Sequence, residues 1–316
     1  MNNKTKLIIL AIIAGLFAAA FLFYDVGRNP DYVLPKRGVK ILAIVLTGSC
    51  IAFSTMIFQT ITNNRILTPS IIGLDSLYLF IQTFIIFVFG SQSLTMANKN
   101  VNFLLSVGLM VLFSLLLYQQ LFKREGRNIY FLLLVGIVFG TLFGSMSSFM
   151  QVLIDPNEFQ IVQDRMFASF NNVNTDLLLV AIISVSAVTI YFMKFSHFLD
   201  VLSLGREHAV NLGIDYDGVV KRLLIIIAIL VSIATALVGP ITFLGLLVAN
   251  VAHEFLRTYQ HKYLITGSIL ISIIALLGGQ FIVEKVFTFS TTLSVIINFI
   301  GGVYFIYLLL RENKSW

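Results

Sequence analysis

The sequence has very little charge. Only 11% of its 316 residues are charged, whereas a soluble domain carries about 25%. Apolar residues make up 58% of the chain, and they fall in long blocks instead of the stripes of an amphipathic soluble helix. A run of about 18 or more apolar residues without charge is typical of a membrane-spanning helix. Such runs fill most of the chain and exclude a sizeable soluble domain between them.

The chain also lacks the motifs of ATP hydrolysis and of metal binding. It contains no Gly-x-x-x-x-Gly-Lys-[Ser/Thr] loop to hold phosphates, and no His-Glu-x-x-His or Cys-x-x-Cys. Four histidines are too scattered for a metal site. Cys50 is the only cysteine, so an intrachain disulfide is impossible, and we expect it to be a small buried residue. We therefore expect no catalytic residue, no metal and no cofactor.

The apolar runs contain few ionisable residues. Ion-coupled carriers usually place such residues near the middle of the membrane, and a membrane-embedded enzyme would gather His, Asp or Glu at one depth. Asp75 is the notable exception, and we interpret it as structural, with Arg65 as a candidate partner. The sequence favours a pathway powered by a separate component, and an ion-coupled carrier is the alternative from another class.

Ten apolar runs are the predicted spans, and we take the first as a span, not a removed signal peptide. Gly239-Pro240 breaks a run too long for one straight span, because Pro removes a backbone donor. We predict an all-α, polytopic membrane protein with a single transmembrane domain over residues 1–316 and a short eighth span. The runs are Leu7–Tyr24, Ile41–Thr62, Ser70–Gly90, Val101–Phe122, Ile129–Ile154, Leu177–Met193, Leu223–Gly239, Pro240–Val251, Tyr263–Val283 and Leu293–Leu310.

Lys and Arg are distributed unevenly between the loops. With the N-terminus inside, the inner segments hold 14 of these residues and the outer segments hold 7. Positive residues concentrate in cytoplasmic loops. We therefore predict a multi-pass protein of the cell membrane whose N- and C-termini are both cytoplasmic. The net charge of +6 is assigned to the lipid surface and not to nucleic acid.

The longest polar segment, from Lys194 to Arg222, contains the pattern of a short helix outside the membrane. Residues 204–213 mix apolar and charged side chains, and Gly213 can end a helix in the left-handed conformation. Such a helix suits a groove on a cytoplasmic partner, or it rests on the lipid surface, and the pattern allows both. The spacing of four predicts that one face carries Leu204, His208 and Leu212.

Three motifs resemble those of one known family. Leu204-Gly-x-Glu-x-Ala-x-x-Leu-Gly213 is similar to the coupling segment of the permeases of ABC importers for iron-siderophore, haem and cobalamin, the FecCD-like family. The stretch from Gly239 to Leu246 is similar to the family's Gly-Pro-Ile-x-Phe-Val-Gly-Leu, and Gly301-Gly302 falls where the family has Gly-Ala-Pro. The order of the motifs and the number of spans match over essentially the whole chain.

The resemblance implies a transport subunit that hydrolyses no ATP itself. Its expected partners are a separate ATP-binding subunit, a second permease subunit, an extracytoplasmic siderophore-binding protein and the lipid bilayer. The family's coupling segment contacts the ATP-binding subunit, and here it corresponds to residues 203–214. The residues implied in this contact are Leu204, Gly205, Arg206, Glu207, Ala209, Leu212 and Gly213.

The resemblance also implies two further sets of functional residues. Arg37 and Lys40 match the two arginines of the family's Arg-x-Pro-Arg motif, which docks the binding protein, and Lys285 is a weaker candidate. The pathway is expected between two permeases, where the fifth and tenth spans and the loop after the second span contribute. The implied pathway and gate residues are Gln59, Asn64, Asn128, Tyr130, Ser145 and Ser148.

Some positions depart from the common family pattern. The family's Asn-Pro-Leu-Ala is replaced by Asn64-Arg65-Ile66-Leu67, and its Gly-Ala by Asp75-Ser76. These stretches look like the branch that handles catecholate siderophores such as petrobactin, which typically pairs two different permeases. We therefore expect a ferric siderophore of the catecholate type as the substrate. Haem or cobalamin import is the alternative within the family.

Overall fold

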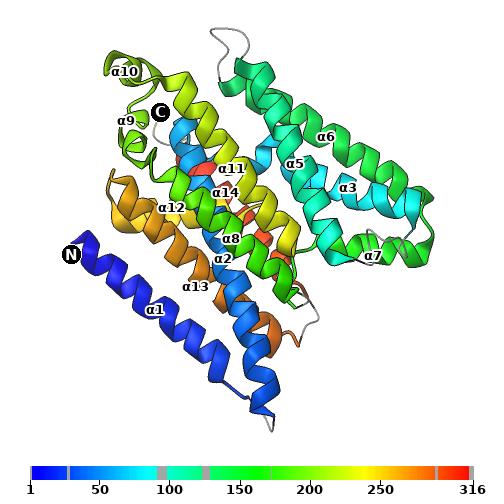
Figure 1. Ribbon diagram of the computed structural model, residues 1–316. Helices are drawn as coiled ribbons and strands as arrows, with labels where there is room; N and C mark the ends of the chain where they lie inside the picture. The colour runs from blue at the N-terminus through cyan, green and yellow to red at the C-terminus, as the bar shows by residue number, and fades with distance from the viewer. Residues whose placement is uncertain are drawn as a thin grey trace.

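The computed structural model describes residues 2–26, 29–90, 98–122, 129–171, 173–288 and 291–312, and the regular elements in these ranges are all helical (Figure 1). This confirms the predicted all-α membrane fold. Seven of the described helices are long and apolar enough to cross a membrane, and α3, α12 and α14 are shorter apolar helices. Each predicted span corresponds to one of ten helices: α1 (Asn3–Phe23), α2 (Pro30–Thr62), α3 (Leu74–Phe89), α5 (Lys99–Phe122), α6 (Ile129–Leu153), α8 (Thr175–Phe192), α11 (Tyr216–Val238), α12 (Leu244–Leu256), α13 (His261–Lys285) and α14 (Leu293–Glu312).

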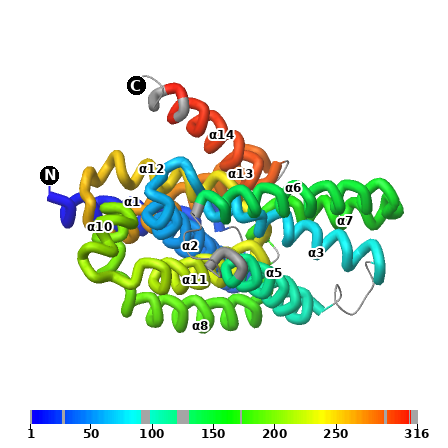
Figure 2. Tube along the Cα trace, turned by 90° about the horizontal axis from the view of Figure 1, so that it is seen from above, coloured from blue at the N-terminus to red at the C-terminus, as the bar shows by residue number. Residues whose placement is uncertain are grey.

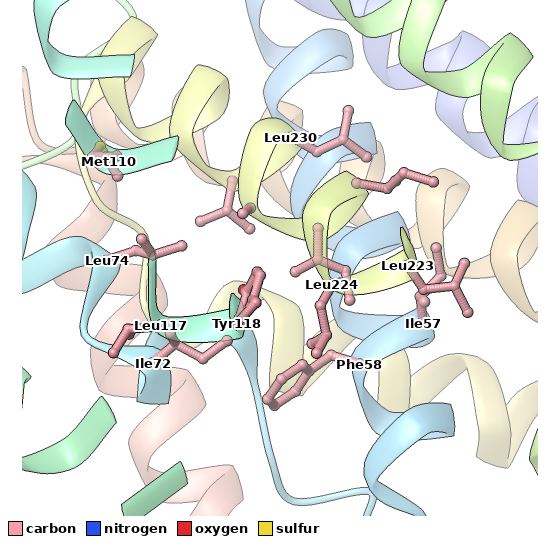
Figure 3. Close-up of a cluster of buried hydrophobic side chains, with 14 of the residues drawn as sticks. Ile57, Phe58, Ile72, Leu74, Met110, Leu117, Tyr118, Leu223, Leu224 and Leu230 are labelled. Atoms are coloured by element: carbon pink, nitrogen blue, oxygen red, sulfur yellow. The ribbon is translucent and has the colours of Figure 1, made fainter. Parts of the chain in front are cut away.

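α2 and α11 form the centre of the bundle. In their most apolar stretches 67% and 72% of the residues are buried, against 17% in α1. α11 packs against α2, α5 and α8, while α2 also packs against α12 and α13, and α1 lies outside α13. Phe58 of α2, Tyr118 of α5 and Leu224 of α11 meet in this core and are fully buried (Figure 3). These two helices therefore determine where the others lie.

Short helices mark the two ends of the bundle. η2 (Ser196–Phe198), α9 (Leu199–Leu202) and α10 (Arg206–Asn211) lie at the end where α1 begins, which we call the α10 end (Figures 1 and 2). α7 (Pro156–Met166) lies at the opposite end, the α7 end.

The sequence analysis did not predict α7, although its first residues carry a helix-start signal. Asp155 precedes Pro156, and its carboxylate accepts a hydrogen bond from the backbone N–H of Asn157 at 2.9 Å. A capping Asp followed by Pro at the first helical position is a common way to begin a helix. α2 likewise begins before the predicted span, at Pro30 instead of Ile41, because its charged first turns continue the helix beyond the apolar run.

The predicted break at Gly239-Pro240 separates α11 from α12. Gly239 has φ +103°, and a Cβ at this position would lie 3.0 Å from Ala168 Cα. The Ser169 N–H donates to Val238 O at 2.8 Å, so the irregular backbone is hydrogen-bonded inside the protein, as a membrane requires. With 13 residues α12 is about 20 Å long, which is shorter than a hydrocarbon core of about 30 Å. The eighth predicted span is therefore partial.

The connection from α2 to α3 returns into the bundle before α3 begins. η1 (Pro69–Ile72) packs against α6, and Gly73 after it has φ +86°. A Cβ on Gly136 of α6 would lie 2.7 Å from Ile72 Cα, which is closer than packed carbons approach. Glycine is thus required where η1 crosses α6.

We expect Gly136→Ala to lower the thermal unfolding temperature of the detergent-purified protein, because the added methyl overlaps the η1 backbone and overpacking costs about 1–3 kcal/mol. Gly144→Ala is the matched control on the same helix, since a Cβ there meets nothing within 4 Å. Alanine at that position should leave stability unchanged or raise it by up to about 1 kcal/mol. Equal unfolding temperatures for the two variants would contradict the packing described for η1.

Candidate functional site

Segment 203–214 forms a turn, the helix α10 and a second turn. Gly205 before α10 has φ +96°, and Gly213 after it has φ +81°, which are conformations that favour glycine. Gly213 therefore adopts the left-handed conformation predicted for it. The prediction of one helix that starts at Leu204 is wrong. Gly205 has a non-helical conformation between α9 and α10, and α10 has only six residues.

One side of segment 203–214 is buried and the other carries exposed apolar side chains. Ala209 is fully buried, whereas Leu204, Val210 and Leu212 are 56%, 48% and 64% exposed. His208 is also exposed, so the three residues predicted to share a face are all accessible, and Val210 adds a further exposed apolar side chain. Large exposed apolar side chains mark an interaction surface, so this face is suited to a partner protein or to the lipid surface. The conformation of the two glycines determines which side chains it presents.

Two charged side chains border this face. Arg206 Nη2 lies 3.4 Å from Asp217 Oδ2, and these side chains are 58% and 57% exposed. Glu207 is also exposed. An exposed ion pair of this kind contributes at most about 1 kcal/mol. Little free energy therefore holds Arg206 to Asp217, and the guanidinium can turn to a carboxylate on a partner.

A buried histidine joins the start of this segment to two long helices. Asp200 Oδ1 in α9 accepts hydrogen bonds from the backbone N–H of His261 at 2.9 Å and from His261 Nδ1 at 2.6 Å. His261 Nε2 lies 2.8 Å from Thr60 Oγ1 in α2. Both ring nitrogens thus have a partner. The ring links α9 to the first residue of α13 and to the last turn of α2, and we call these contacts the Asp200–His261–Thr60 network.

The other end of the segment is also held on α2. Asp215 Oδ1 accepts a hydrogen bond from the Gly218 N–H at 3.1 Å and caps α11. Tyr216, the first residue of α11, donates its hydroxyl to Ile61 O at 3.4 Å. Segment 203–214 is therefore anchored to the last turn of α2 on both sides.

A cavity of 650 Å³ lies beside this anchor and contains two of the predicted gate residues, Gln59 and Asn64. Gln59 Nε2 donates to Arg65 O at 2.6 Å, and Asn250 Nδ2 of α12 donates to the same carbonyl at 2.9 Å. Asn64 Oδ1 accepts from the Ile66 N–H at 2.9 Å. The loop after α2 is therefore fixed by side chains from α2 and α12. Ser203 of the segment also lines the cavity.

Three of the remaining predicted pathway residues, Tyr130, Ser145 and Ser148, lie on α6 and do not line this cavity. Tyr130 at its start is 56% exposed, and Ser145 and Ser148 are exposed farther along the helix. Asn128 lies outside the described residues. The structure therefore separates the predicted gate into a loop part at the cavity and a helical part on α6.

α6 and α14 expose apolar side chains along much of their length. Phe149 of α6 is 67% exposed and Phe299 of α14 is 73% exposed. α14 packs against α12 and α13 near its first half and then projects away from the bundle (Figure 2). A Cβ on Gly301 would lie 2.4 Å from Phe243 Cβ, so glycine allows this packing. Both helices offer faces that a lipid or another helix can cover.

The three predicted docking residues lie at the α7 end. Arg37 Nη1 donates to the carbonyls of Tyr24 at 2.7 Å and Leu22 at 3.1 Å, so it satisfies the last turn of α1. Lys285 Nζ lies 2.5 Å from Asp25 Oδ2, and its hydrogen bond and charge lower the pKa of the Asp25 carboxyl below the usual value. Both residues thus tie the α1–α2 connection to its neighbours, and a docking role stays a prediction.

Lys40 forms the most protected of these contacts. Its Nζ lies 2.8 Å from Glu284 Oε1 of α13, and the two side chains are 19% and 11% exposed. The same Glu284 oxygen accepts from Gln280 Nε2 at 2.9 Å. Lys40 therefore joins α2 to α13 at the α7 end, in addition to any docking role.

Asp75 has a partner other than the one the sequence suggested. Thr235 Oγ1 of α11 donates to Asp75 Oδ1 at 3.4 Å, whereas Arg65 lines the cavity at the α10 end. Asp75 thus hydrogen-bonds within the bundle, in agreement with its predicted structural role.

Sequence reasoning missed the Asp200–His261–Thr60 network. Its members come from positions 60, 200 and 261, so no local motif contains them. The sequence did contain a signal for two of its members. Asp200 precedes the coupling motif in a polar loop, and His261 begins an apolar run. Among the described residues, no group of three or more His, Cys, Asp or Glu side chains gathers where it could hold a metal ion.

Comparison with known proteins decides the family. The model of the FecCD transport family matches residues 7–311. The chain belongs to this family. Among FecCD relatives, the petrobactin import system permease protein YclO of Bacillus subtilis is 71% identical over 316 residues, which is 100% of both chains. FatC, a petrobactin import permease of Bacillus anthracis, is 39% identical over 89% of this chain and 79% of its own length.

Two more distant matches extend the comparison. FatD, also a petrobactin import permease of Bacillus anthracis, is 25% identical over 97% of this chain and 90% of its own length. A solved structure of an ABC transporter of the metal-chelate type, in an inward-facing conformation, has a TM-score of 0.84 at 21% identity, with 98% of this chain and 100% of that chain covered. At this identity the match shows a shared fold, and it extends over the full set of helices in this FecCD permease.

We expect Lys40→Met to lower the unfolding temperature, because Glu284 loses its cation in a site that is mostly shielded from water. The cost should be about 1–3 kcal/mol, between the values for exposed and for fully buried pairs. Lys36→Met is the matched control one turn earlier on α2, since Lys36 is exposed and contacts only Tyr32, four residues away on the same helix, among the described residues. Thermal unfolding in detergent measures the unfolding temperatures of the two variants. An equal decrease in both temperatures would contradict a structural role for Lys40.

Proposed function

We propose that this chain is a permease subunit of an ATP-driven importer that carries ferric siderophores of the petrobactin, catecholate type across the cell membrane. The observation that carries the proposal is the 71% identity to the petrobactin permease YclO along the full length of both chains. FatC, at 39% identity, has the same named substrate. The poverty of ionisable groups in the apolar runs fits a pathway that is driven from outside the chain.

In this proposal the α10 end is cytoplasmic, and both termini lie on that side. The excess of Lys and Arg in the predicted inner segments supports this orientation. Leu204, Val210 and Leu212 then face the cytoplasm, where lipid does not cover them, and a separate ATP-binding subunit receives them in a groove. Arg206 and Glu207 pair with charges beside that groove, and ATP is hydrolysed on that subunit.

The shape of segment 203–214 supports a coupling role. Gly205 and Gly213 fix the two turns, and Ala209 holds α10 to the core, so a push on the exposed face moves the segment as a unit. The Asp200–His261–Thr60 network then passes the motion to α2 and α13. Gln59 moves with α2 because it lies next to Thr60. Its hydrogen bond to the Arg65 carbonyl then moves the loop that carries Asn64. Gating by Gln59 and Asn64 is the proposed result.

A second permease subunit is the proposed partner for the exposed faces of α6 and α14. The pathway runs between the two permeases, and Ser145 and Ser148 line it while Tyr130 and Asn128 belong to its cytoplasmic gate. Bacillus anthracis has two petrobactin permeases, FatC and FatD, that are both similar to this chain. This supports a pore made of two different chains. At the α7 end Arg37, Lys40 and Lys285 are the proposed contacts for acidic residues of a siderophore-binding protein.

The proposal predicts that Leu212→Glu abolishes both transport and capture of the ATP-binding subunit, because a buried charge in the groove is costly. The measurements are radioiron uptake in a strain that lacks this permease, offered ferric petrobactin, ferric hydroxamates or haem, and co-purification of the ATP-binding chain. Wild-type protein should restore uptake from ferric petrobactin alone.

Lys194→Gln is the control, because this exposed residue lies outside segment 203–214. It should transport normally. Uptake by vesicles that contain the permeases without ATP, or normal uptake by Leu212→Glu at normal protein levels, would refute the coupling role. Restored uptake of haem instead of ferric petrobactin would refute the proposed substrate.

A further inference from the structure

The cavity at the α10 end has a strongly biased lining. Arg65 and Arg257 contribute two guanidinium cations, His253 and His261 add imidazole rings, and no carboxylate occurs among the described residues that line it. Leu264 is the one aliphatic side chain in that lining. A concave surface with one sign of charge concentrates ions of the opposite sign. The cavity is therefore suited to a small anion and poorly suited to an acyl chain.

The two arginines are carried on backbone that is held in place. The carbonyl of Arg65 accepts hydrogen bonds from Gln59 Nε2 at 2.6 Å and from Asn250 Nδ2 at 2.9 Å. Arg257 ends α12 in the left-handed conformation, with φ +50°, and its N–H donates to His253 O at 3.0 Å. Among the described residues none forms a hydrogen bond or ion pair with either guanidinium. Both forks are free to bind oxygen atoms of a ligand.

The carboxylate of Asp200, which contacts His261 of the lining, is already engaged. Asp200 Oδ1 accepts both the backbone N–H and Nδ1 of His261, so its charge is directed to that residue. The arginines therefore have no carboxylate of their own in the lining. Guanidinium groups recognise phosphate and carboxylate with paired, charge-assisted hydrogen bonds.

A buried amide oxygen on a residue that lines the same cavity indicates which further group the ligand carries. Gln59 is 3% exposed, and its Oε1 has no hydrogen-bond partner, while its Nε2 is fixed on Arg65 O. Leaving a buried oxygen without a hydrogen bond is unfavourable. Gln59 lines the cavity together with both arginines, so a ligand that offers a hydroxyl beside its anionic oxygens matches the donors and the acceptor present there. Hydrogen phosphate has this pattern, and so does a phosphoglycerol headgroup.

We propose that this cavity is a binding site for a phosphate-type oxyanion that carries a hydroxyl group. Arg65 and Arg257 bind the anionic oxygens, and Gln59 Oε1 accepts a hydrogen bond from the hydroxyl. The occupant joins the loop after α2 to the turn before α13, next to the Asp200–His261–Thr60 network. The site does not depend on the identity of the transported substrate, and it can be tested by binding alone.

The test uses the full chain in nanodiscs of zwitterionic lipid, titrated with inorganic phosphate in a calorimeter. Wild-type protein should bind saturably, and Arg65→Gln and Arg257→Gln should each weaken binding by at least about tenfold, as expected for a charge-assisted pair. Lys262→Gln is the matched control, because this exposed residue adjoins His261 without lining the cavity. It should bind phosphate like the wild type. Elution volume and unfolding temperature identify a variant that fails to fold, in which case the other arginine variant decides.

A parallel titration in phosphatidylglycerol nanodiscs separates the two sources of the anion. Unchanged phosphate binding there assigns the site to a soluble anion. Loss of the phosphate signal, together with weaker retention of phosphatidylglycerol by the arginine variants, assigns it to a lipid headgroup. The proposal is overturned if wild-type protein shows no saturable phosphate binding in zwitterionic nanodiscs, or if both folded arginine variants bind phosphate as the wild type does.

Discussion

Asp200 holds the first residue of α13 through two hydrogen bonds, and the ring of that residue reaches Thr60 on α2. The position of segment 203–214 depends on this partly buried contact, because α10 itself has only six residues and is too short to be stable alone. The network fixes the start of the segment, and Tyr216 on Ile61 fixes its end. An exposed apolar face with a defined shape results, and it is attached to the most buried helix pair of the bundle.

The rest of the architecture follows from the requirement that backbone N–H and C=O groups in a membrane form hydrogen bonds within the protein. Helices with internally satisfied hydrogen bonds can face lipid, so α1, α6 and α14 expose large apolar side chains. Irregular backbone occurs inside the protein instead, at η1 and at Gly239, where glycines allow other segments to approach closely. α3 and α12 are short because the chain uses these buried turns in place of further helix. The polar groups of the loop after α2 gather at the cavity, beside the anchor of segment 203–214.

Sequence reasoning could predict what depends on local composition. The ten apolar helices, the break at Gly239 and the turn at Gly213 are all encoded by runs or single residue types, and the structure contains them. α7 was missed because its apolar content is low, although the start at Asp155-Pro156 was readable. The pairing of Asp200, His261 and Thr60, the partner of Asp75 and the gathering of Arg65 with Arg257 could not be predicted. Each depends on contacts between residues that are far apart in sequence, and only the packed bundle determines them.

The central claim is that segment 203–214 is attached rigidly to α13 and α2. A distance measurement between spin labels at His208→Cys and Lys262→Cys tests it most directly, because both positions are exposed and Cys50 is 1% exposed and so protected from labelling. In the complex with its ATP-binding subunit, we expect one narrow distance that is the same with and without ATP, and a broad distribution when His261→Ala is added. A distance in the His261-containing protein that shifts or broadens on ATP binding would contradict a rigid attachment of segment 203–214 to α13.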